Sequence, residues 1–152
     1  YELSGMEAYC VYAAAKYVSQ VFYDYGEGFS QENSILIHDC FTEEKDVHFT
    51  VDVPKGVKQI RIDPCSYRCA VTVKDIAAGE QHFAKDNMTV NGVWANENCV
   101  IFDTEDPNLV FACEGADRLD VTLEVVELPE SLTATLIEVV TPKENGLKRF
   151  FH

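Results

Sequence analysis

The strongest constraint on the fold is a strict alternation of apolar and polar residues between positions 47 and 63. Every second residue of the run 47–53 is Val or Phe, and the residues between them are polar. The run 57–63 alternates in the same way, with two isoleucines on its apolar face. A period of two residues is typical of a β-strand that buries one face. Pro54-Lys55-Gly56 lies between the runs and has the composition of a turn, so we predict a β-hairpin.

The rest of the chain repeats this strand pattern. Residues 133–140 are rich in β-branched side chains, which favours a last strand, with a helix as the alternative. Turn residues separate the runs, and no long helical pattern lies between them. We therefore predict an all-β fold, a two-sheet antiparallel sandwich of the jelly-roll, carbohydrate-binding-module-like type. The other predicted strands cover residues 19–25, 34–38, 70–76, 99–102, 109–112 and 119–128, with a weaker one at 88–90.

The length of 152 residues is that of one domain. We expect the sandwich to occupy residues 16–140. Residues 1–15 are expected to be a linker or lead-in segment, with a short helix or an extra strand as alternatives, and residues 141–152 a lead-out tail. The chain does not begin with Met, so we expect it to be a segment of a longer protein.

The charge of the chain argues against two classes of partner. Only 12 basic residues stand against 26 acidic ones, which gives a net charge of −14. Nucleic acid and anionic membrane surfaces attract clustered Lys and Arg, and no such cluster is present. No apolar run approaches the roughly 20 residues that span a bilayer. We predict no nucleic-acid partner and no membrane insertion, and we expect a cytoplasmic protein.

The six cysteines sit mostly inside apolar runs. Buried free thiols in a reducing compartment explain this placement more simply than a disulfide framework does. We therefore expect no structural disulfide. Cys65 and Cys69 are the pair best placed to contradict that expectation.

Signatures of catalysis are missing. The sequence contains no Gly-rich phosphate loop, no Gly-x-Ser-x-Gly elbow and no clustered zinc ligands. We predict that this domain is not an enzyme and needs no cofactor. Acidic turns at 103–108 and 24–32 leave a structural calcium ion open, although turn residues of this kind commonly face water. Hydrolysis by paired carboxylates would require a pocket in which they converge.

Aromatic and polar side chains are the remaining candidates for ligand binding. Exposed aromatic rings can stack on sugar rings, whereas core packing is the competing role for each of them. Arg61 and Asp63 lie two residues apart on one strand, so they share a face and can form an ion pair or bind sugar hydroxyls. The candidate ligand-binding residues are Tyr25, Arg61, Asp63, Tyr67, Arg68 and Trp94.

Two segments carry a resemblance to a known family. Residues 23–30 read Tyr-Asp-Tyr-Gly-Glu-Gly-Phe-Ser, and 53–57 with 60–65 form a second motif. Over about residues 16–128 the chain resembles the β-sandwich modules appended to bacterial glycosyltransferases of the family 2 and rhamnan-synthesis type. The resemblance implies an accessory role beside a glycosyltransferase and carries over no catalytic residue. Its motifs look structural, since they consist of glycine turns and a proline strand end.

Our leading hypothesis is therefore a non-catalytic accessory domain that binds or positions glycan during surface polysaccharide synthesis. The expected partners are an oligosaccharide or polysaccharide and the neighbouring domains of the parent chain. The alternative is a structural spacer or protein-interaction domain with no sugar ligand. A small hydrolase is the third hypothesis.

Overall fold

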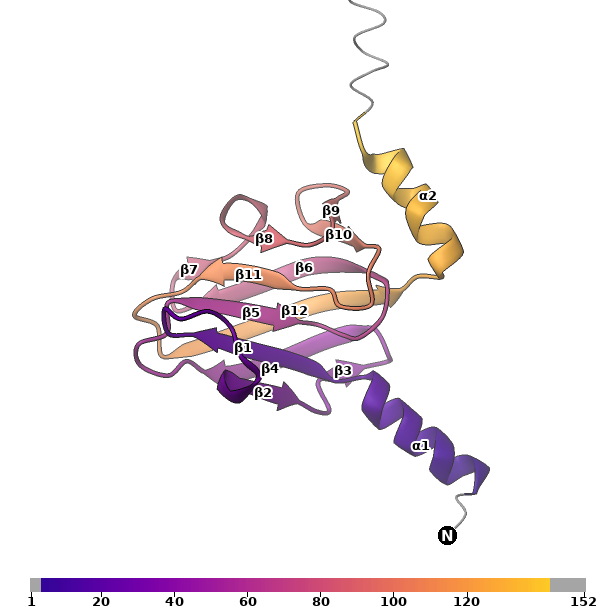
Figure 1. Cartoon of the computed structure of the whole chain (residues 1–152), viewed down its shortest axis with the longest axis horizontal. Helices are drawn as coiled ribbons and strands as arrows, with labels where there is room; N and C mark the ends of the chain where they lie inside the picture. Colours follow the sequence, from indigo (N-terminus) through magenta and orange to yellow (C-terminus); the bar gives the residue numbers. More distant parts are fainter. Residues whose placement is uncertain (1–3, 143–152) are drawn as a thin grey trace, which may run out of the picture.

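The computed structural model describes residues 4–142, which form two antiparallel sheets packed face to face (Figure 1). Sheet A contains, in spatial order, β2 (Ser34–Ile37), β1 (Ser19–Asp24), β5 (Gln59–Asp63), β11 (Leu109–Ala112) and β8 (Thr89–Val90). Sheet B contains β3 (Phe41–Thr42), β4 (Asp46–Asp52), β12 (Arg118–Glu127), β6 (Cys69–Ala78), β10 (Cys99–Phe102) and β9 (Val93–Trp94), and β7 (Gln81–His82) pairs with β6. The prediction of a two-sheet antiparallel fold is confirmed.

The core lies between the sheets and follows the period-two pattern directly. Alternate residues of β12, from Leu119 to Val125, are fully buried, as are Ile60 and Ile62 of β5. Both sheets contribute to a single apolar cluster. Each such Val, Leu or Ile side chain stabilises the fold by about 1.5–3 kcal/mol through burial. The alternation in the sequence therefore indicates which face of each strand packs against the opposite sheet.

The predicted hairpin at 47–63 is wrong. β4 pairs with β3 and β12 in sheet B, whereas β5 pairs with β1 and β11 in sheet A. The turn itself is present, because Val57 donates to the carbonyl of Pro54 at 3.4 Å and Gly56 has a φ of 89°. The turn carries the chain from one sheet to the other. Alternation shows that both strands bury a face against the core, but it does not show which strand each one pairs with.

Both ends of the sandwich continue into helices that project away from it (Figure 1). α1 (Gly5–Lys16) occupies the segment expected to be a linker, so the helical alternative is the correct one there. α2 (Glu130–Val140) replaces the strand expected at 133–140. Pro129 fixes the entry into α2, and Thr133 donates both its backbone N–H and its hydroxyl to the carbonyl of Pro129, at 3.1 and 2.8 Å.

These helices shorten the sandwich relative to the predicted range of 16–140. Its strands run from residue 19 to residue 127. Two short 3₁₀ turns, η1 (Gln31–Asn33) and η2 (Lys85–Asn87), precede β2 and β8. Most of the tail expected at 141–152 lies outside the described residues. Within residues 4–142, neither helix has the length and apolar character that a membrane span requires.

The glycine turn of the first resemblance motif is fixed by one carboxylate. Asp24 ends β1, is buried, and accepts the backbone N–H groups of Gly26 and Gly28 at 2.7 and 2.8 Å through the same oxygen. Both glycines have positive φ, at 112° and 94°. This conformation is costly for residues with a Cβ atom, so the two glycines have a structural role.

Candidate functional site

The outer face of sheet A carries a connected group of polar side chains that includes two predicted site residues, Arg61 and Asp63. Val21, Ile60 and Ile62 point into the core, so their neighbours on β1 and β5 point outward. The register places Phe22 opposite Arg61. It also places Gln20 opposite Asp63. The face therefore has an aromatic ring and a charged pair at its centre.

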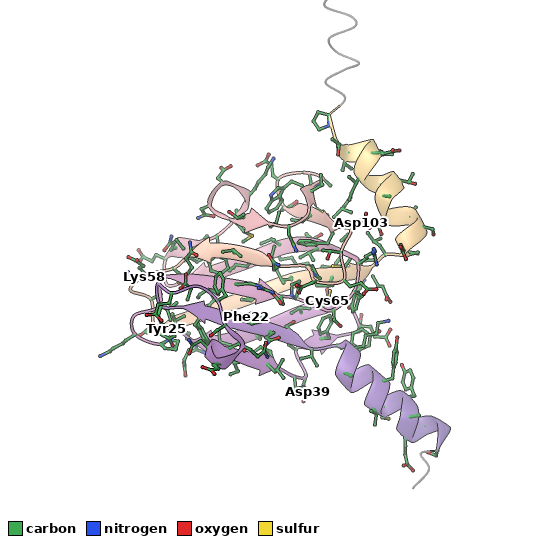
Figure 2. All side chains as sticks on the ribbon, in the orientation of Figure 1. Phe22, Tyr25, Asp39, Lys58, Cys65 and Asp103 are labelled. Atoms are coloured by element: carbon green, nitrogen blue, oxygen red, sulfur yellow. The ribbon has the colours of Figure 1, made fainter. Side chains whose placement is uncertain are left out.

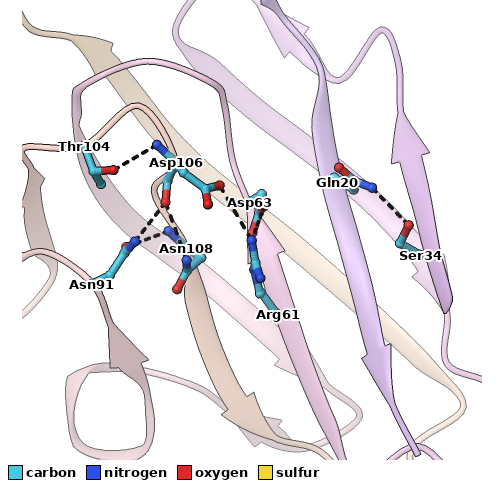
Figure 3. Close-up of polar contacts among 8 residues, drawn as sticks. All are labelled: Gln20, Ser34, Arg61, Asp63, Asn91, Thr104, Asp106 and Asn108. Atoms are coloured by element: carbon cyan, nitrogen blue, oxygen red, sulfur yellow. Dashed lines mark hydrogen bonds and ion pairs between the residues drawn. The ribbon is translucent and has the colours of Figure 1, made fainter. Parts of the chain in front are cut away.

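Arg61 is held in place by three groups. Its Nε and one terminal nitrogen donate to the two carboxylate oxygens of Asp63 at 2.7 and 2.8 Å (Figure 3). The guanidinium lies over the Phe22 ring, 4.5 Å from its centroid, and 3.6 Å from a carboxylate oxygen of Asp106. The ion pair expected from the two-residue spacing is therefore present. Because Arg61 covers Phe22, which is only 7% exposed, that ring is not open for stacking.

Burial and charge oppose each other at this pair. Burial raises the pKa of Asp63, and the hydrogen bonds and positive charge of Arg61 counteract that rise. The hydrogen bond to Asp63 in turn raises the pKa of Arg61. Asp63 is thus a partly buried carboxylate whose charge is compensated by a fixed guanidinium.

The loop between β10 and β11 brings Asp106 to Arg61. Asn91 donates to the carbonyl of Asp106 at 2.8 Å and accepts the backbone N–H of Asn108 at 2.8 Å (Figure 3). The hydroxyl of Thr104 accepts the backbone N–H of Asp106 at 3.1 Å. These bonds fix the loop, so the position of Asp106 above sheet A is set by its own backbone.

A pocket of about 380 Å³ lies on this face and is bordered by β2 and by the β10–β11 loop. We call it the sheet A pocket. This volume is within the range usual for small-molecule sites. Val18 and Leu36 supply apolar lining, and Cys65 contributes a thiol. The polar lining consists of Gln20, His38, Asp63, Ser66, Glu105 and Asp106.

The structure does not gather the six predicted site residues into one groove. Tyr25 lies beside Lys58 at the opposite end of the sandwich from Cys65 (Figure 2). Trp94 is half-buried and packs against the core from β9, at an edge of sheet B. Of the six, Asp63 lines the sheet A pocket and Arg61 is bonded to it. A binding role for Tyr25 and Trp94 stays a prediction.

Tyr67 and Arg68 have structural partners instead. Tyr67 is 9% exposed and packs edge-on against Tyr17. The open stacking face expected of a ligand-binding tyrosine is therefore absent at Tyr67. Tyr67 belongs to the buried core cluster, against which Tyr17 also packs. Arg68 makes ion pairs with Asp103 at 3.0 Å and Glu105 at 3.5 Å. It thereby ties this loop to the β10–β11 loop.

Most of the pocket lining was not identified from the sequence. Gln20, His38 and Ser66 lie on three separate segments, and no local motif marks them. The sequence marks Glu105 and Asp106 only as acidic turn residues. The alternation along β1 and β5 is the sequence pattern that bears on this pocket. It places Gln20 and Asp63 on the outward faces of their strands, but it does not show that the two strands are neighbours.

The acidic turns do not converge on a metal site among residues 4–142, where no group of three or more His, Cys, Asp or Glu side chains is arranged to hold a metal ion. Asp103 and Asp106 instead face Arg68 and Arg61, and Asp24 bonds backbone N–H groups. Comparison of the chain with protein-family models, with curated proteins and with solved structures finds no match.

Proposed function

We propose that this chain is a non-catalytic accessory domain of a bacterial glycosyltransferase that binds neutral glycan at the sheet A pocket during surface polysaccharide synthesis. The observation that carries the proposal is the pocket itself, where polar side chains from several elements meet beside the fixed pair of Arg61 and Asp63. The motif resemblance supplies the glycosyltransferase context. The proposal includes a jelly-roll, carbohydrate-binding-module-like sandwich and a cytoplasmic location.

The chemistry of the pocket suits a sugar. Sugar hydroxyls both donate and accept hydrogen bonds, and the pocket offers an amide at Gln20, an imidazole at His38 and a hydroxyl at Ser66. Val18 and Leu36 provide apolar surface for the C–H groups of a ring. A mostly apolar wall with a few directed polar groups is the usual composition of a binding pocket.

The charge of the pocket favours a neutral ligand. Asp63, Glu105 and Asp106 carry negative charge, and the nearby cations Arg61 and Arg68 are already bonded to carboxylates. A uronic acid or a phosphate would meet an excess of negative charge there, because Arg61 and Arg68 each face at least two carboxylates. Because Arg61 contacts both Asp63 and Asp106, these carboxylates act as hydrogen-bond acceptors in the proposal and not as acid catalysts.

Titration calorimetry of the whole chain with a panel of neutral and uronic-acid oligosaccharides tests the proposal. We expect binding of a neutral glycan, lost in Gln20→Ala and in Asp106→Ala. Lys58→Ala is the matched control, since it removes an exposed side chain at the opposite end of the sandwich that belongs to no candidate site. Absence of binding to every oligosaccharide at millimolar concentration, or equal loss in the control, would contradict it.

A second candidate function, a spacer or protein-interaction domain, is supported by the exposed helices. Four apolar side chains of α1 are more than half exposed, and Val139 of α2 is 74% exposed. A helix of this length is marginally stable alone in water, so another surface is needed to cover it. The four side chains of α1 are Met6, Tyr9, Val11 and Tyr12.

The C-terminal end of α1 is anchored to the sandwich. Lys16 pairs with Glu127 of β12 at 2.7 Å, and its ammonium lies 5.3 Å from the ring centroid of Tyr67. This function predicts self-association or docking onto a neighbouring domain, without glycan binding. Light scattering on the whole chain checks it: a dimer abolished by Val11→Asp favours this function, and a monomer that binds glycan opposes it.

A further inference from the structure

Two cysteines are in contact at the wall of the sheet A pocket. Cys65 follows the end of β5, and Cys69 is the first residue of β6. Their sulfur atoms are 3.5 Å apart, and both residues are buried. The Cys65 thiol also lies 3.4 Å from the carbonyl oxygen of Tyr67, to which it can donate. The pair is therefore held together by the short loop between the cysteines.

The two cysteines differ in whether they border the pocket. Cys65 lines the sheet A pocket, whereas Cys69 is fully buried behind it. The hydrogen bond with the neighbouring Cys65 thiol raises the pKa of Cys69 well above the ordinary value for a thiol, and burial raises it further. Cys69 therefore stays protonated, and a reagent in the pocket meets Cys65 first. A thiol that borders a pocket and contacts a second thiol is an arrangement that favours oxidation to a disulfide.

We propose that Cys65 and Cys69 are a reversible oxidation site, at which a hydroperoxide entering the sheet A pocket converts the dithiol into an intramolecular disulfide. The sulfur atoms must approach by about 1.5 Å to reach disulfide bonding distance. Side-chain rotation within the loop 65–69 supplies this movement. The site does not depend on glycan binding.

The reaction proceeds in two balanced steps. The Cys65 thiolate attacks one peroxide oxygen, the O–O bond breaks, and a sulfenic acid forms on Cys65 while the other oxygen leaves as an alcohol or water. The Cys69 sulfur then attacks the sulfenic sulfur, the S–O bond breaks, and the hydroxyl leaves as water with the Cys69 proton. Two thiols lose two electrons in total, and the hydroperoxide gains them.

The disulfide would link the two sheets. β5 belongs to sheet A and β6 to sheet B, so a bond between Cys65 and Cys69 joins the end of one to the start of the other. It would also restrain Ser66 and Arg68, which lie on the loop between the two cysteines. Oxidation would thus be expected to rigidify the edge of the pocket.

Peptide mapping of the native chain tests the site directly. Trypsin cleaves after Arg61, Arg68 and Lys74, which places the two cysteines in separate peptides. After treatment with hydrogen peroxide and alkylation of the remaining thiols, we expect peptides 62–68 and 69–74 to be linked, and a dithiol reductant to separate them. Exposed Cys10 reports in the same sample that hydrogen peroxide reacted with the chain.

Variants identify the order of the steps. In Cys69→Ser we expect no linked peptide and a sulfenic acid on Cys65 that a dimedone reagent captures, whereas Cys65→Ser should leave Cys69 unmodified. Cys113→Ala is the matched control, because it removes a buried thiol that lies beside Lys58, at the opposite end of the sandwich from Cys65. Oxidation of Cys10 in the wild-type chain without any linked peptide would overturn the proposal, and this readout requires no variant to fold.

Discussion

Replacing Arg61 by Met removes the charge at the centre of the sheet A face and keeps most of the side-chain stem over Phe22. Asp63 then loses both hydrogen bonds, at 2.7 and 2.8 Å, while staying only 13% exposed. Hydrogen bonds to charged groups contribute about 1.5–3 kcal/mol each when buried. The Arg61 side chain is 24% exposed, which weakens the pair through solvent screening.

The expected loss follows from these opposing factors. We expect Arg61→Met to lower the free energy of unfolding by about 2 kcal/mol at neutral pH, including the penalty of an unpaired carboxylate. For a chain of this size, that corresponds to a decrease in Tm of about 4–8 °C. Arg118→Met, which changes an exposed arginine at the start of β12, is the matched control and should change stability by less than about 0.5 kcal/mol.

The loss should depend on pH with a defined sign. Burial raises the pKa of Asp63 above its ordinary value of 3.8, and Arg61 opposes that rise. Without Arg61 the folded-state pKa rises further. A carboxyl group with a raised folded-state pKa contributes stability below the unfolded-state pKa and loses it as the pH rises through the folded-state pKa. The deficit of the variant should therefore be largest at neutral pH and shrink as the pH falls toward 4.

Urea denaturation followed by the fluorescence of Trp94, the single tryptophan, measures these changes. A double-mutant cycle with Asp63→Asn isolates the pairwise contribution, which we expect to be about 1 kcal/mol. An unchanged denaturation midpoint in Arg61→Met, or a deficit that grows as the pH falls, would refute the reasoning.

Three further changes test the fold. Asp24→Ala should lower the free energy of unfolding by about 1–2 kcal/mol, because two backbone N–H groups lose their acceptor. Asp24→Asn keeps an acceptor oxygen, so it should lower the free energy of unfolding by less in the same urea assay. Gly92→Ala should destabilise the chain by about 2 kcal/mol or more, because the added Cβ would lie 2.6 Å from the carbonyl oxygen of Ile101; a wild-type Tm would contradict this. Burial raises the pKa of Tyr23 to about 12 from 10.0 and raises the pKa values of Tyr17 and Tyr67 as well. Alkaline absorbance titration should therefore show three late phenols among residues 4–142, and stability should fall as the pH rises above about 10.

The outcome for individual elements shows how far local patterns reach. Period-two alternation located most strands to within two residues, because it reports directly that one face of a strand is buried. β10 and β11 match the predicted ranges 99–102 and 109–112. The same pattern could not assign pairing. β4 and β5 are close in sequence and still lie in opposite sheets.

Local sequence was also ambiguous at α2. β-Branched residues at 133–140 favour a strand by propensity, but the entry at Pro129 and the two bonds from Thr133 to its carbonyl start a helix there. Propensity is a weak preference that a few specific hydrogen bonds can override.

The candidate site divides in the same way. The sequence alone determined that Arg61 and Asp63 share an outward face, because side chains two residues apart on a strand point the same way. Only the tertiary structure placed Phe22 beneath Arg61, Asp106 above it and Cys65 beside the pocket, and only it buried Tyr67. The physical reason is that parity along a strand is a local property of the backbone, whereas contacts between strands and loops depend on a register that the whole core selects.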